Sequence, residues 1–472
     1  MVFSSLEFIF IFFPAVFAGY FFLNKYKLVL LSKIWLILSS LFFYSYWNVN
    51  YLPLILSSVL VNFIISRVLT EYEYYERIFF SKKSILLVGI LFNLSLLGYF
   101  KYMDFFITNM NYLVGSDIEL LNYALPLAIS FFTLQQIAFI IDSYENLVKE
   151  RNFINYSLFV TFFPQLIAGP IVHHKGMMPQ FESLKSKIFN KSNIKLGFFI
   201  FSIGAFKKIV LADTFAVWSD LGFSNSDSLT FLQAWITSLS YSFQLYFDFS
   251  GYTDMAIGLA CMFNISIPHN FNSPFKATNI IDFWKRWHMT LTNFIASYIY
   301  TPLLMSFKKI NLFNAMLTTF ITMQIAGIWH GAEWKYIVFG TLHSSALVLN
   351  HLWKSYKFKI NKILGWLITF LFVSITFTIF RGDDLYQSFN IIKTMFGFTE
   401  FNLALEGIEI LNIFYLIASL IFVLISKNTL HYINIRKYNI SFALFLFFMA
   451  VLQMNLMLIS DDDLSKFIYF NF

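Results

Sequence analysis

The sequence predicts an all-α, polytopic integral membrane protein. Of its 472 residues, 58% are hydrophobic and 12% are charged, whereas a soluble domain carries roughly a quarter charged residues. Long apolar stretches recur every few tens of residues, and the basic residues concentrate in alternate loops between them. These observations predict about 11–12 transmembrane helices, with re-entrant and amphipathic helices, around a central chamber.

Twelve stretches have the apolarity of candidate spans. Several are shorter than the roughly 20 residues that a perpendicular helix needs, so we expect tilted or partly embedded helices. In chain order they are 8–23, 34–47, 54–66, 85–100, 123–141, 196–215, 231–249, 312–329, 336–353, 364–380, 411–425 and 441–459.

The net charge is +7, and its distribution is informative. Lysine and arginine cluster in 25–33, 67–83, 185–195, 354–362 and 427–437. Positive loops stay in the cytoplasm, so alternating the spans places both termini outside the cytoplasm. The excess of basic over acidic residues therefore indicates membrane topology and not a nucleic-acid partner.

The chain shows no internal repeat and no low-complexity linker, which predicts one integral membrane domain over residues 1–472. Prolines break two regions. Pro164 and Pro170 interrupt the apolar segment 162–172, which is too short to span and is expected to enter the membrane and return, and further prolines break 250–310. Non-helical backbone at such depth must be buried in protein or line a wet cavity.

The first unusual polar cluster lies in YSFQLYFDFSGYTDM, at the end of an apolar stretch. Gln244, Asp248 and Asp254 flank Gly251, which we expect to be flexible. An ionisable group at mid-membrane costs about 2.5–3.5 kcal/mol on insertion scales and needs a reason. One explanation is that Gln244 and Asp248 bind substrate. The other is structural, with the carboxylates capping a helix or bonding to the backbone.

The second cluster is FNSPFKATNIIDFWKRWHMTL, in which Asn279 or Asp282 is expected to start a helix. That helix would carry Trp284 and His288 on one face, four residues apart. An interfacial helix with aromatic and basic anchors explains most of it, but not His288. We count Trp284 and Arg286 as candidate substrate-binding residues.

The third cluster, ITMQIAGIWHGAEW, places His330 at the end of an apolar helix between Gly327 and Gly331. A core histidine is the structural interpretation. The functional one is a general base, because imidazole accepts a proton near neutral pH and the glycines leave it approachable. Trp329 beside it is a candidate substrate-binding residue.

No metal or bound cofactor is expected. The chain has no HExxH motif, no Gly-rich dinucleotide motif and one cysteine, Cys261. His173 and His174 are adjacent, which makes convergence of both imidazoles on one ion difficult.

Together the motifs resemble the membrane-bound O-acyltransferase family, in its bacterial branch of alginate and peptidoglycan O-acetyltransferases. The resemblance rests on SFFTLQQIAFIID, FFPQLIAGPIVHHKGMMPQF, IGAFKKIVLAD, YFDFSGYTDMAIGLA, FNSPF, FWKRWH and IWHGAEW, in that order over nearly the whole chain.

The resemblance implies an enzyme in the bacterial cytoplasmic (inner) membrane, surrounded by lipid, with His330 as the essential histidine and His288 as the second position. It implies acetyl-CoA as donor substrate and an extracytoplasmic partner of the SGNH-hydrolase type. Lys207 and Lys208 are candidates for the donor phosphates, with snorkelling to the interface as the alternative.

The carboxy-terminal FIYFNF resembles the F-x-Y-F motif of a small protein of teichoic-acid D-alanylation systems, whose tyrosine is proposed to accept the acyl group. The resemblance implies that Tyr469 is the acceptor hydroxyl and third catalytic residue. A membrane-interface anchor is the alternative.

Our leading hypothesis is transfer of acetyl across the membrane for O-acetylation of an envelope polysaccharide. Abundant Phe, Ile, Asn and Lys indicate an AT-rich genome, which favours peptidoglycan over alginate or another exopolysaccharide. The alternatives are a transporter or flippase for polysaccharide precursors, which often shows repeated halves, and an inert scaffold.

Overall fold

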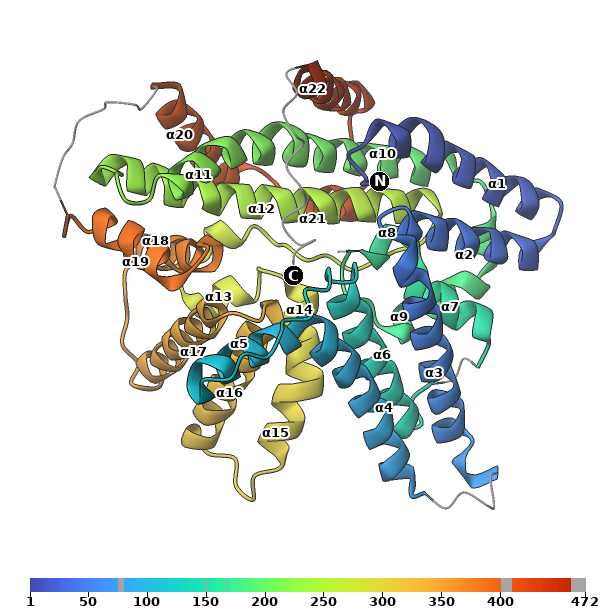
Figure 1. Cartoon of the computed structure of the whole chain (residues 1–472). Coiled ribbons are helices and arrows are strands. Elements are labelled where there is room, and N and C mark those ends of the chain that lie inside the picture. The colour runs from blue at the N-terminus through green and yellow to red at the C-terminus, as the bar shows by residue number, and fades with distance from the viewer. Residues whose placement is uncertain (75–79, 149–150, 168, 400–409, 460–472) are drawn as a thin grey trace.

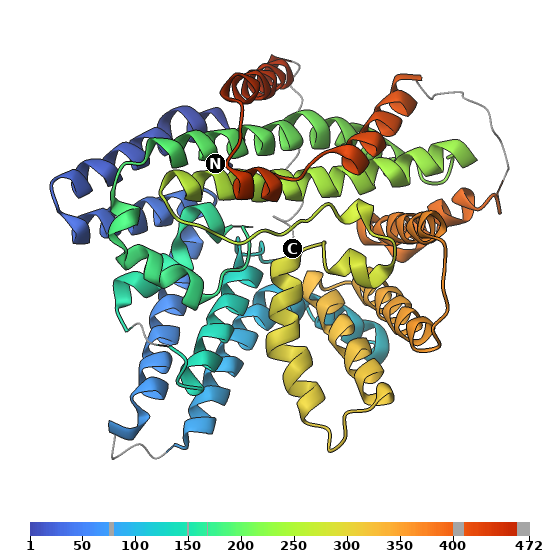
Figure 2. The same cartoon turned by 180° about the vertical axis from the view of Figure 1, so that it is seen from behind.

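A computed structural model describes residues 1–74, 80–148, 151–167, 169–399 and 410–459. Every regular element in those ranges is helical, as the sequence predicts. The long helix α12 (Phe231–Met262) lies beside α10 (Lys191–Ala205) and α11 (Asp213–Ser224). The remaining helices fan out from this layer (Figures 1 and 2).

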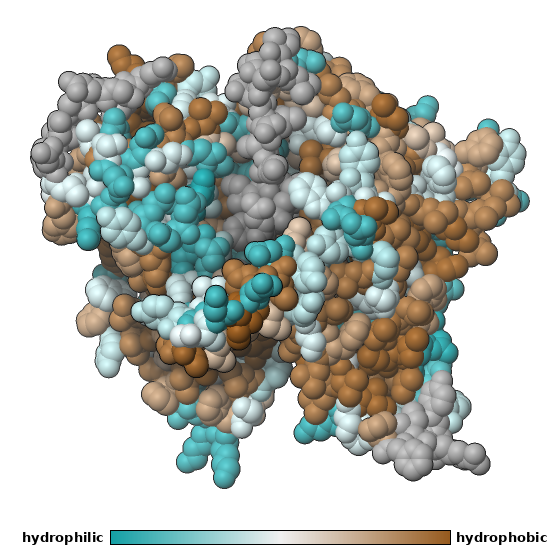
Figure 3. All heavy atoms as spheres, viewed as in Figure 1, coloured by the Kyte–Doolittle hydropathy of each residue, from teal (hydrophilic) through white to brown (hydrophobic). Residues whose placement is uncertain are grey.

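Seven helices of the described ranges are long and apolar enough to cross a membrane. They cover Phe8–Lys25, Val49–Thr70, Lys82–Val114, Leu312–His330, Lys362–Arg381, Ile410–Ile435 and Ile440–Met457. Large apolar side chains on them face outward, among them Phe10, Leu91 and Phe448, each more than half exposed. Apolar residues cover much of the face over α1 (Phe13–Lys25) and α3 (Leu52–Thr70), whereas hydrophilic residues gather around α11 (Figure 3). A surface of this kind requires lipid, and the chain is a multi-pass membrane protein.

Other predicted spans fall on helices that are shorter or more polar. The stretch 34–47 lies on α2 (Val29–Ser45), and 336–353 lies on α17 (Trp334–Ser355). The stretch 123–141 becomes helical only at α6 (Ile129–Tyr144). Residues before it form a loop because Asp104 binds the backbone N–H groups of Leu121 and Asn122, which holds them out of a helix.

Short helices connect these elements. Their bounds are Phe153–Thr161 (α7), Phe163–Leu166 (α8), His174–Glu182 (α9), Ile280–Trp284 (α13), Met289–Ile295 (α14), Thr301–Met305 (α15), Leu385–Met395 (α19) and Thr429–Ile435 (α21).

The contact between α10 and α12 brings two backbones together at glycines. A Cβ on Gly204 would lie 2.5 Å from the Gly251 carbonyl oxygen, and one on Gly251 would lie 2.7 Å from the Gly204 carbonyl oxygen. Gly197 and Gly258 repeat this arrangement two turns away. Small residues permit close helix approach within membranes. Gly251 is therefore a packing residue inside α12, and the expected flexibility is wrong.

The proline-broken segment 162–172 is buried in protein, as its backbone requires. Phe162 and Phe163 are fully buried. The Phe163 N–H donates to Ser40 Oγ at 3.1 Å, and the Ile171 N–H donates to Thr290 Oγ1 at 3.0 Å. Side chains from distant helices thus replace the hydrogen bonds that the broken helix lacks.

We predict that Gly204→Val strongly lowers the yield and melting temperature of the detergent-solubilised protein. The side chain meets backbone atoms of α12 that cannot move aside, and overpacking of this kind costs at least about 1–3 kcal/mol. Gly176→Val is the matched control, because an added Cβ there meets nothing within 4 Å. A Gly204→Val protein that melts at the parental temperature contradicts this packing.

Candidate active site

His330 ends α16 (Leu312–His330) and lies in an aromatic enclosure. It is 4% exposed. Its ring centroid lies 5.2 Å from Phe380 of α18 (Lys362–Arg381) and 6.3 Å from Phe339 of α17. The imidazole is thus surrounded by groups that exclude water.

The glycines beside His330 allow α17 to approach α16. A Cβ on Gly327 would lie 2.5 Å from the Tyr336 carbonyl oxygen, and one on Gly331 would lie 2.0 Å from Tyr336 Cε2. The expectation that they leave the imidazole open is wrong, because Tyr336 fills that space. Instead they bring the walls of α17 close to His330.

His288 comes from a turn between two short helices. Asn279 Oδ1 accepts the Asp282 N–H at 3.0 Å, so Asn279 caps α13 as predicted. However, α13 ends at Trp284, and His288 takes left-handed backbone angles (φ 43°, ψ 52°) before α14. Trp284 and His288 therefore do not share one helical face.

Backbone hydrogen bonds explain this break. The Asn272 N–H donates to the Arg286 carbonyl and the Met289 N–H donates to the Asn270 carbonyl, both at 2.9 Å. Bonds to the non-helical segment that contains Asn270 and Asn272 thus replace the continued helix. The turn buries His288 against Phe249 of α12, with ring centroids 4.8 Å apart. Burial lowers the pKa of His288 to about 3, so its imidazole is neutral near pH 7.

Trp329 brings the two histidines into one site. Its ring centroid lies 5.1 Å from that of His330 and 6.3 Å from that of His288. Trp329 is 7% exposed, and its indole N–H has no acceptor among the described residues. A buried donor that lacks an acceptor favours a role in binding a substrate oxygen.

Trp284 contacts a third histidine, His343, which the sequence analysis missed. Its indole N–H donates to His343 Nδ1 at 3.2 Å, and His343 Nε2 lies 3.0 Å from Thr376 Oγ1. Both ring nitrogens of the fully buried His343 thus have partners, which is typical of a structural histidine.

Asp248 lies in an ion cluster on α12. Lys208 Nζ is 2.6 Å from Asp248 Oδ1 and 2.8 Å from Asp213 Oδ1, and all three residues are buried. Neither a helix cap nor a backbone bond explains the carboxylate, because its partner is a lysine. The cluster also keeps Lys208 away from the interface, so neither donor binding nor snorkelling describes it.

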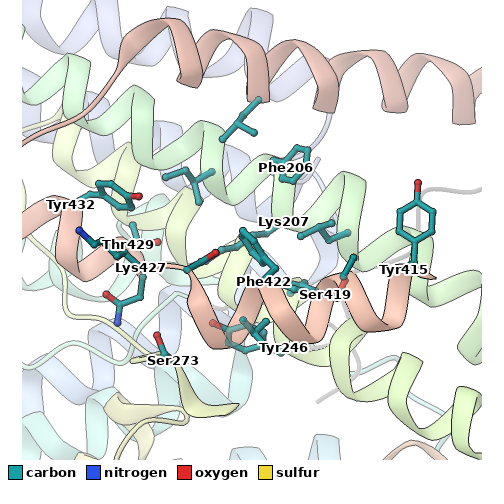
Figure 4. A pocket seen from close by; sticks show the side chains of 18 of the residues that line it. Phe206, Lys207, Tyr246, Ser273, Tyr415, Ser419, Phe422, Lys427, Thr429 and Tyr432 are labelled. Carbon is teal, nitrogen blue, oxygen red and sulfur yellow. The ribbon is translucent and has the colours of Figure 1, made fainter. Parts of the chain in front are cut away.

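Lys207 lies one residue away and faces a different space. Its Nζ is 2.6 Å from Asp254 Oδ2, which also accepts the Thr429 hydroxyl at 2.7 Å. Lys207 lines a cavity of about 610 Å³ between α12, α20 (Ile410–Ile425), α21 and α22 (Ile440–Ile459), whose walls are mostly apolar and include several aromatic rings (Figure 4). Ring contacts from Tyr246 through Phe271 and Phe249 lead from this cavity to His288.

Two other predicted substrate-binding residues stand apart from this group. Gln244 is buried on α12, and its Oε1 accepts no hydrogen bond from the described residues. Arg286 is held by Asp282 Oδ1 at 2.8 Å and by the Asn272 carbonyl at 3.2 Å. Its guanidinium thus stabilises the turn that leads to His288.

Comparison with known proteins decides the family. The sequence model of the membrane-bound O-acyltransferase family matches residues 41–379. The chain belongs to the membrane-bound O-acyltransferase family. It is 46% identical over 448 residues to a peptidoglycan O-acetyltransferase of Helicobacter pylori, covering 87% of this chain and 83% of that protein.

More distant members of the family carry related names. The chain is 34% identical over 412 residues to a probable alginate O-acetylase of Pseudomonas aeruginosa, covering 86% of this chain and 76% of that protein. It is 28% identical over 307 residues to a teichoic acid D-alanyltransferase of Streptococcus thermophilus, covering 58% and 72%. Membership of an acyltransferase family supports an enzyme over a transporter or an inert scaffold.

His173 and His174 do converge in this acyltransferase, contrary to the expectation from their adjacency. Both Nε2 atoms lie 2.8 Å from Asp142 Oδ2. The Lys175 N–H donates to His173 Nδ1, so in the neutral ring the proton is on Nε2. That tautomer donates to the carboxylate, and the three side chains form a hydrogen-bonded cluster whose ligand atoms lie close together.

Lys101 is the polar residue near His330 that the sequence analysis missed. It lies in the π-helical turn η4 (Gly98–Tyr102), inside the apolar segment Lys82–Val114. The predicted span 85–100 ends one residue before Lys101, so the signal for it in the sequence was weak. Tyr469, the predicted acceptor, lies outside the described residues.

We predict that Asp248→Asn lowers the melting temperature and folded yield of this acyltransferase. Removal of one partner from a buried ion pair costs about 3–5 kcal/mol. Asp282→Asn, which breaks a partly exposed pair with Arg286, is the control and should cost less than about 1 kcal/mol. If Asp248→Asn melts like the parent but transfers no acyl group, Asp248 acts on substrate instead.

Proposed function

We propose that this protein takes acetyl from cytoplasmic acetyl-CoA and passes it to an outward-facing hydroxyl, for O-acetylation of a cell-envelope polysaccharide. The observation that carries the proposal is the meeting of His330 and His288 at Trp329, within walls formed by Phe249, Phe339 and Phe380. Imidazole in a dry enclosure can move a proton while a thioester is protected from water.

In this mechanism His330 is the general base. It takes the proton of the acceptor hydroxyl while the hydroxyl oxygen attacks the thioester carbonyl carbon. The carbon–sulfur bond breaks, the acetyl ester forms, and His330 returns the proton to the departing sulfur to give the free thiol. His288 orients the thioester or relays a proton, and the Trp329 N–H donates to the carbonyl oxygen as negative charge develops.

Tyr469 is the acceptor in this proposal. A phenol near pKa 10 is a poor nucleophile at neutral pH and needs an adjacent base. Its acetyl ester is activated and can pass to a serine of an extracytoplasmic SGNH-type partner, which restores the tyrosine hydroxyl. The partner then transfers acetyl to the polymer.

The identity of the polymer rests on the relatives. The relative at 46% identity is named a peptidoglycan O-acetyltransferase, and the relative at 34% identity a probable alginate O-acetylase. Peptidoglycan is the acceptor we favour, and alginate or another exopolysaccharide is the next candidate. The donor phosphates would meet Lys207 from the cytoplasmic side.

We place the protein in the bacterial cytoplasmic membrane with both termini outside. The support is the set of basic loops, which the positive-inside rule assigns to the cytoplasm. This arrangement puts the donor entrance and the carboxy-terminal acceptor on opposite faces.

We expect His330→Ala to abolish acetyl transfer and leave folding intact, because loss of a general base typically lowers the rate 10²- to 10⁴-fold. His288→Asn should retain partial activity, since an amide can hydrogen-bond but cannot relay a proton. Transfer of labelled acetyl from acetyl-CoA in proteoliposomes measures both, and His351→Ala on α17 is the control. Activity of His330→Ala within a few-fold of the parent would remove His330 from the chemistry.

Tyr469→Phe should express normally and acetylate no polymer, because it keeps the ring and loses the nucleophile. Mass spectrometry of the parent's carboxy-terminal peptide should detect Tyr469 carrying an acetyl group, and its neighbour variant Phe467→Leu should retain polymer acetylation. Normal polymer acetylation by Tyr469→Phe would mean that the tyrosine is an anchor and that acetyl passes directly from donor to partner.

A further inference from the structure

A groove beside the start of α10 is lined by three basic side chains. Lys185 comes from the short turn η5 (Leu184–Lys187), Lys191 begins α10, and Arg436 follows α21. The groove has a volume of about 560 Å³, and the other described residues that line it are neutral. All three cations are exposed, and among the described residues no carboxylate forms an ion pair with them. The groove therefore carries an excess of positive charge.

Side-chain amides hold the walls of this groove in place. Asn193 Nδ2 donates to Asn264 Oδ1, and Asn264 Nδ2 donates to the Ile188 carbonyl, both at 2.8 Å. Arg436 Nη1 donates to Asn193 Oδ1 at 3.4 Å. Because Asn264 lies shortly after α12, these bonds tie the segment before α10 to the ends of α12 and α21. The basic side chains are thus anchored on a fixed frame.

The backbone N–H groups at the start of α10 are already used. Asn190 Oδ1 accepts the N–H groups of Ser192 at 3.0 Å and of Asn193 at 3.2 Å, which caps the helix. An anion in the groove would therefore be bound by the three basic side chains and not by the end of the helix.

Apolar side chains alternate with the basic ones in the same segment. Leu184, Ile188 and Phe189 are 74%, 64% and 54% exposed. The ring centroid of Phe189 lies 5.6 Å from that of Phe21, near the end of the candidate span Phe8–Lys25. Exposed apolar groups interleaved with lysines are typical of a segment that lies in the headgroup region of a bilayer. The groove thus lies at a membrane boundary.

We propose that this groove binds the headgroup of an anionic phospholipid, with Lys185, Lys191 and Arg436 around the phosphate and the acyl chains against Ile188 and Phe189. Basic clusters next to a membrane span recognise anionic lipids through charge. A free phosphate would use the cations but leave the apolar side chains exposed, whereas a lipid accounts for both. In the topology proposed above, the site faces the cytoplasmic leaflet.

The first test measures which lipids the purified protein retains. The protein is exchanged into detergent micelles that contain equal amounts of phosphatidylglycerol and phosphatidylcholine with the same chains, and bound lipid is counted by native mass spectrometry. We expect the parent to prefer phosphatidylglycerol. Lys185→Gln/Lys191→Gln/Arg436→Gln should weaken its retention on the order of 100-fold, because each basic residue near an anionic membrane surface strengthens binding about fivefold.

A second triple variant controls for the loss of charge. Lys354→Gln/Lys359→Gln/Lys362→Gln removes three exposed lysines around the connection between α17 and α18, none of which lines the groove. This variant should retain phosphatidylglycerol as the parent does. Equal losses in both triple variants would mean that total charge and not the groove attracts the lipid, which overturns the proposal. Parental retention in the groove variant, or no preference of the parent for the anionic lipid, would also overturn it.

Two further measurements separate a lipid from a soluble phosphate. Ile188→Ser keeps the net charge and should lower phosphatidylglycerol retention roughly fivefold, since less apolar surface is buried against the acyl chains. Neither inorganic phosphate nor acetyl-CoA at millimolar concentration should displace the lipid. Displacement by either compound, with parental retention in Ile188→Ser, would make the groove a site for a soluble phosphate and would overturn the proposal.

A double variant covers the case in which the triple groove variant does not fold. Lys185→Gln/Lys191→Gln keeps the bond of Arg436 to Asn193, and its retention of phosphatidylglycerol should fall roughly 25-fold. Parental retention in this folded variant would contradict the lipid site. None of these measurements needs acetyl transfer, so the lipid site and the proposed function are tested independently.

Discussion

The backbone contact between α10 and α12 is the constraint on which the rest of the structure depends. Four glycines let the helices touch, and this brings the two lysines that follow α10 onto the carboxylates of α12. A methyl group at Gly204 or Gly251 would separate these partners. Phe249, which packs on His288, lies on α12 between the paired residues Asp248 and Asp254. The placement of the site residues therefore depends on a contact between glycines, which have no reactive side chain.

The second requirement is that irregular backbone within the protein finds partners. The chain from 268 to 273 is not helical, and the peptide groups of Asn270 and Asn272 bond to Met289 and Arg286. This pairing ends α13 early and creates the left-handed turn at His288. Thr290 then links the same region to the proline-broken segment through the Ile171 N–H and to Asn270 Oδ1. Two regions that prolines break in the sequence thus form one buried support for His288.

Sequence reasoning found the residue types but not their geometry. An all-helical membrane protein follows from composition, whereas His330 and His288 stand out as polar residues whose roles the family resemblance implies. The prediction that Trp284 and His288 share one helical face is wrong. Helical periodicity does not reveal hydrogen bonds to a segment some fifteen residues away. Gly251, Gly327 and Gly331 were interpreted as flexible or open, since a glycine in sequence gives no sign of which helix will approach it.

The positions of the charged residues show even more clearly that the sequence does not predict which side chains meet. Asp248 and Lys208 are forty residues apart, and their buried ion pair is defined only by the α10–α12 contact. Lys101 adjoins a predicted span, where it resembles an interfacial lysine that reaches the membrane surface. Only the fold shows that it turns inward to the end of α16.

These placements explain how one protein can hold several charges in an apolar interior without giving each a chemical role. Lys208 is neutralised by Asp213 and Asp248 and stabilises the layer of helices, whereas the Lys207–Asp254 pair borders the cavity in which we propose donor binding. Lys101 is held differently, by a carbonyl and a hydroxyl oxygen next to the end of α16. Around His330 and His288 the neighbouring groups are mainly aromatic rings. Charged side chains of the interior are thus held by partners of opposite charge or by neutral oxygens, while the two histidines lie among rings that exclude water.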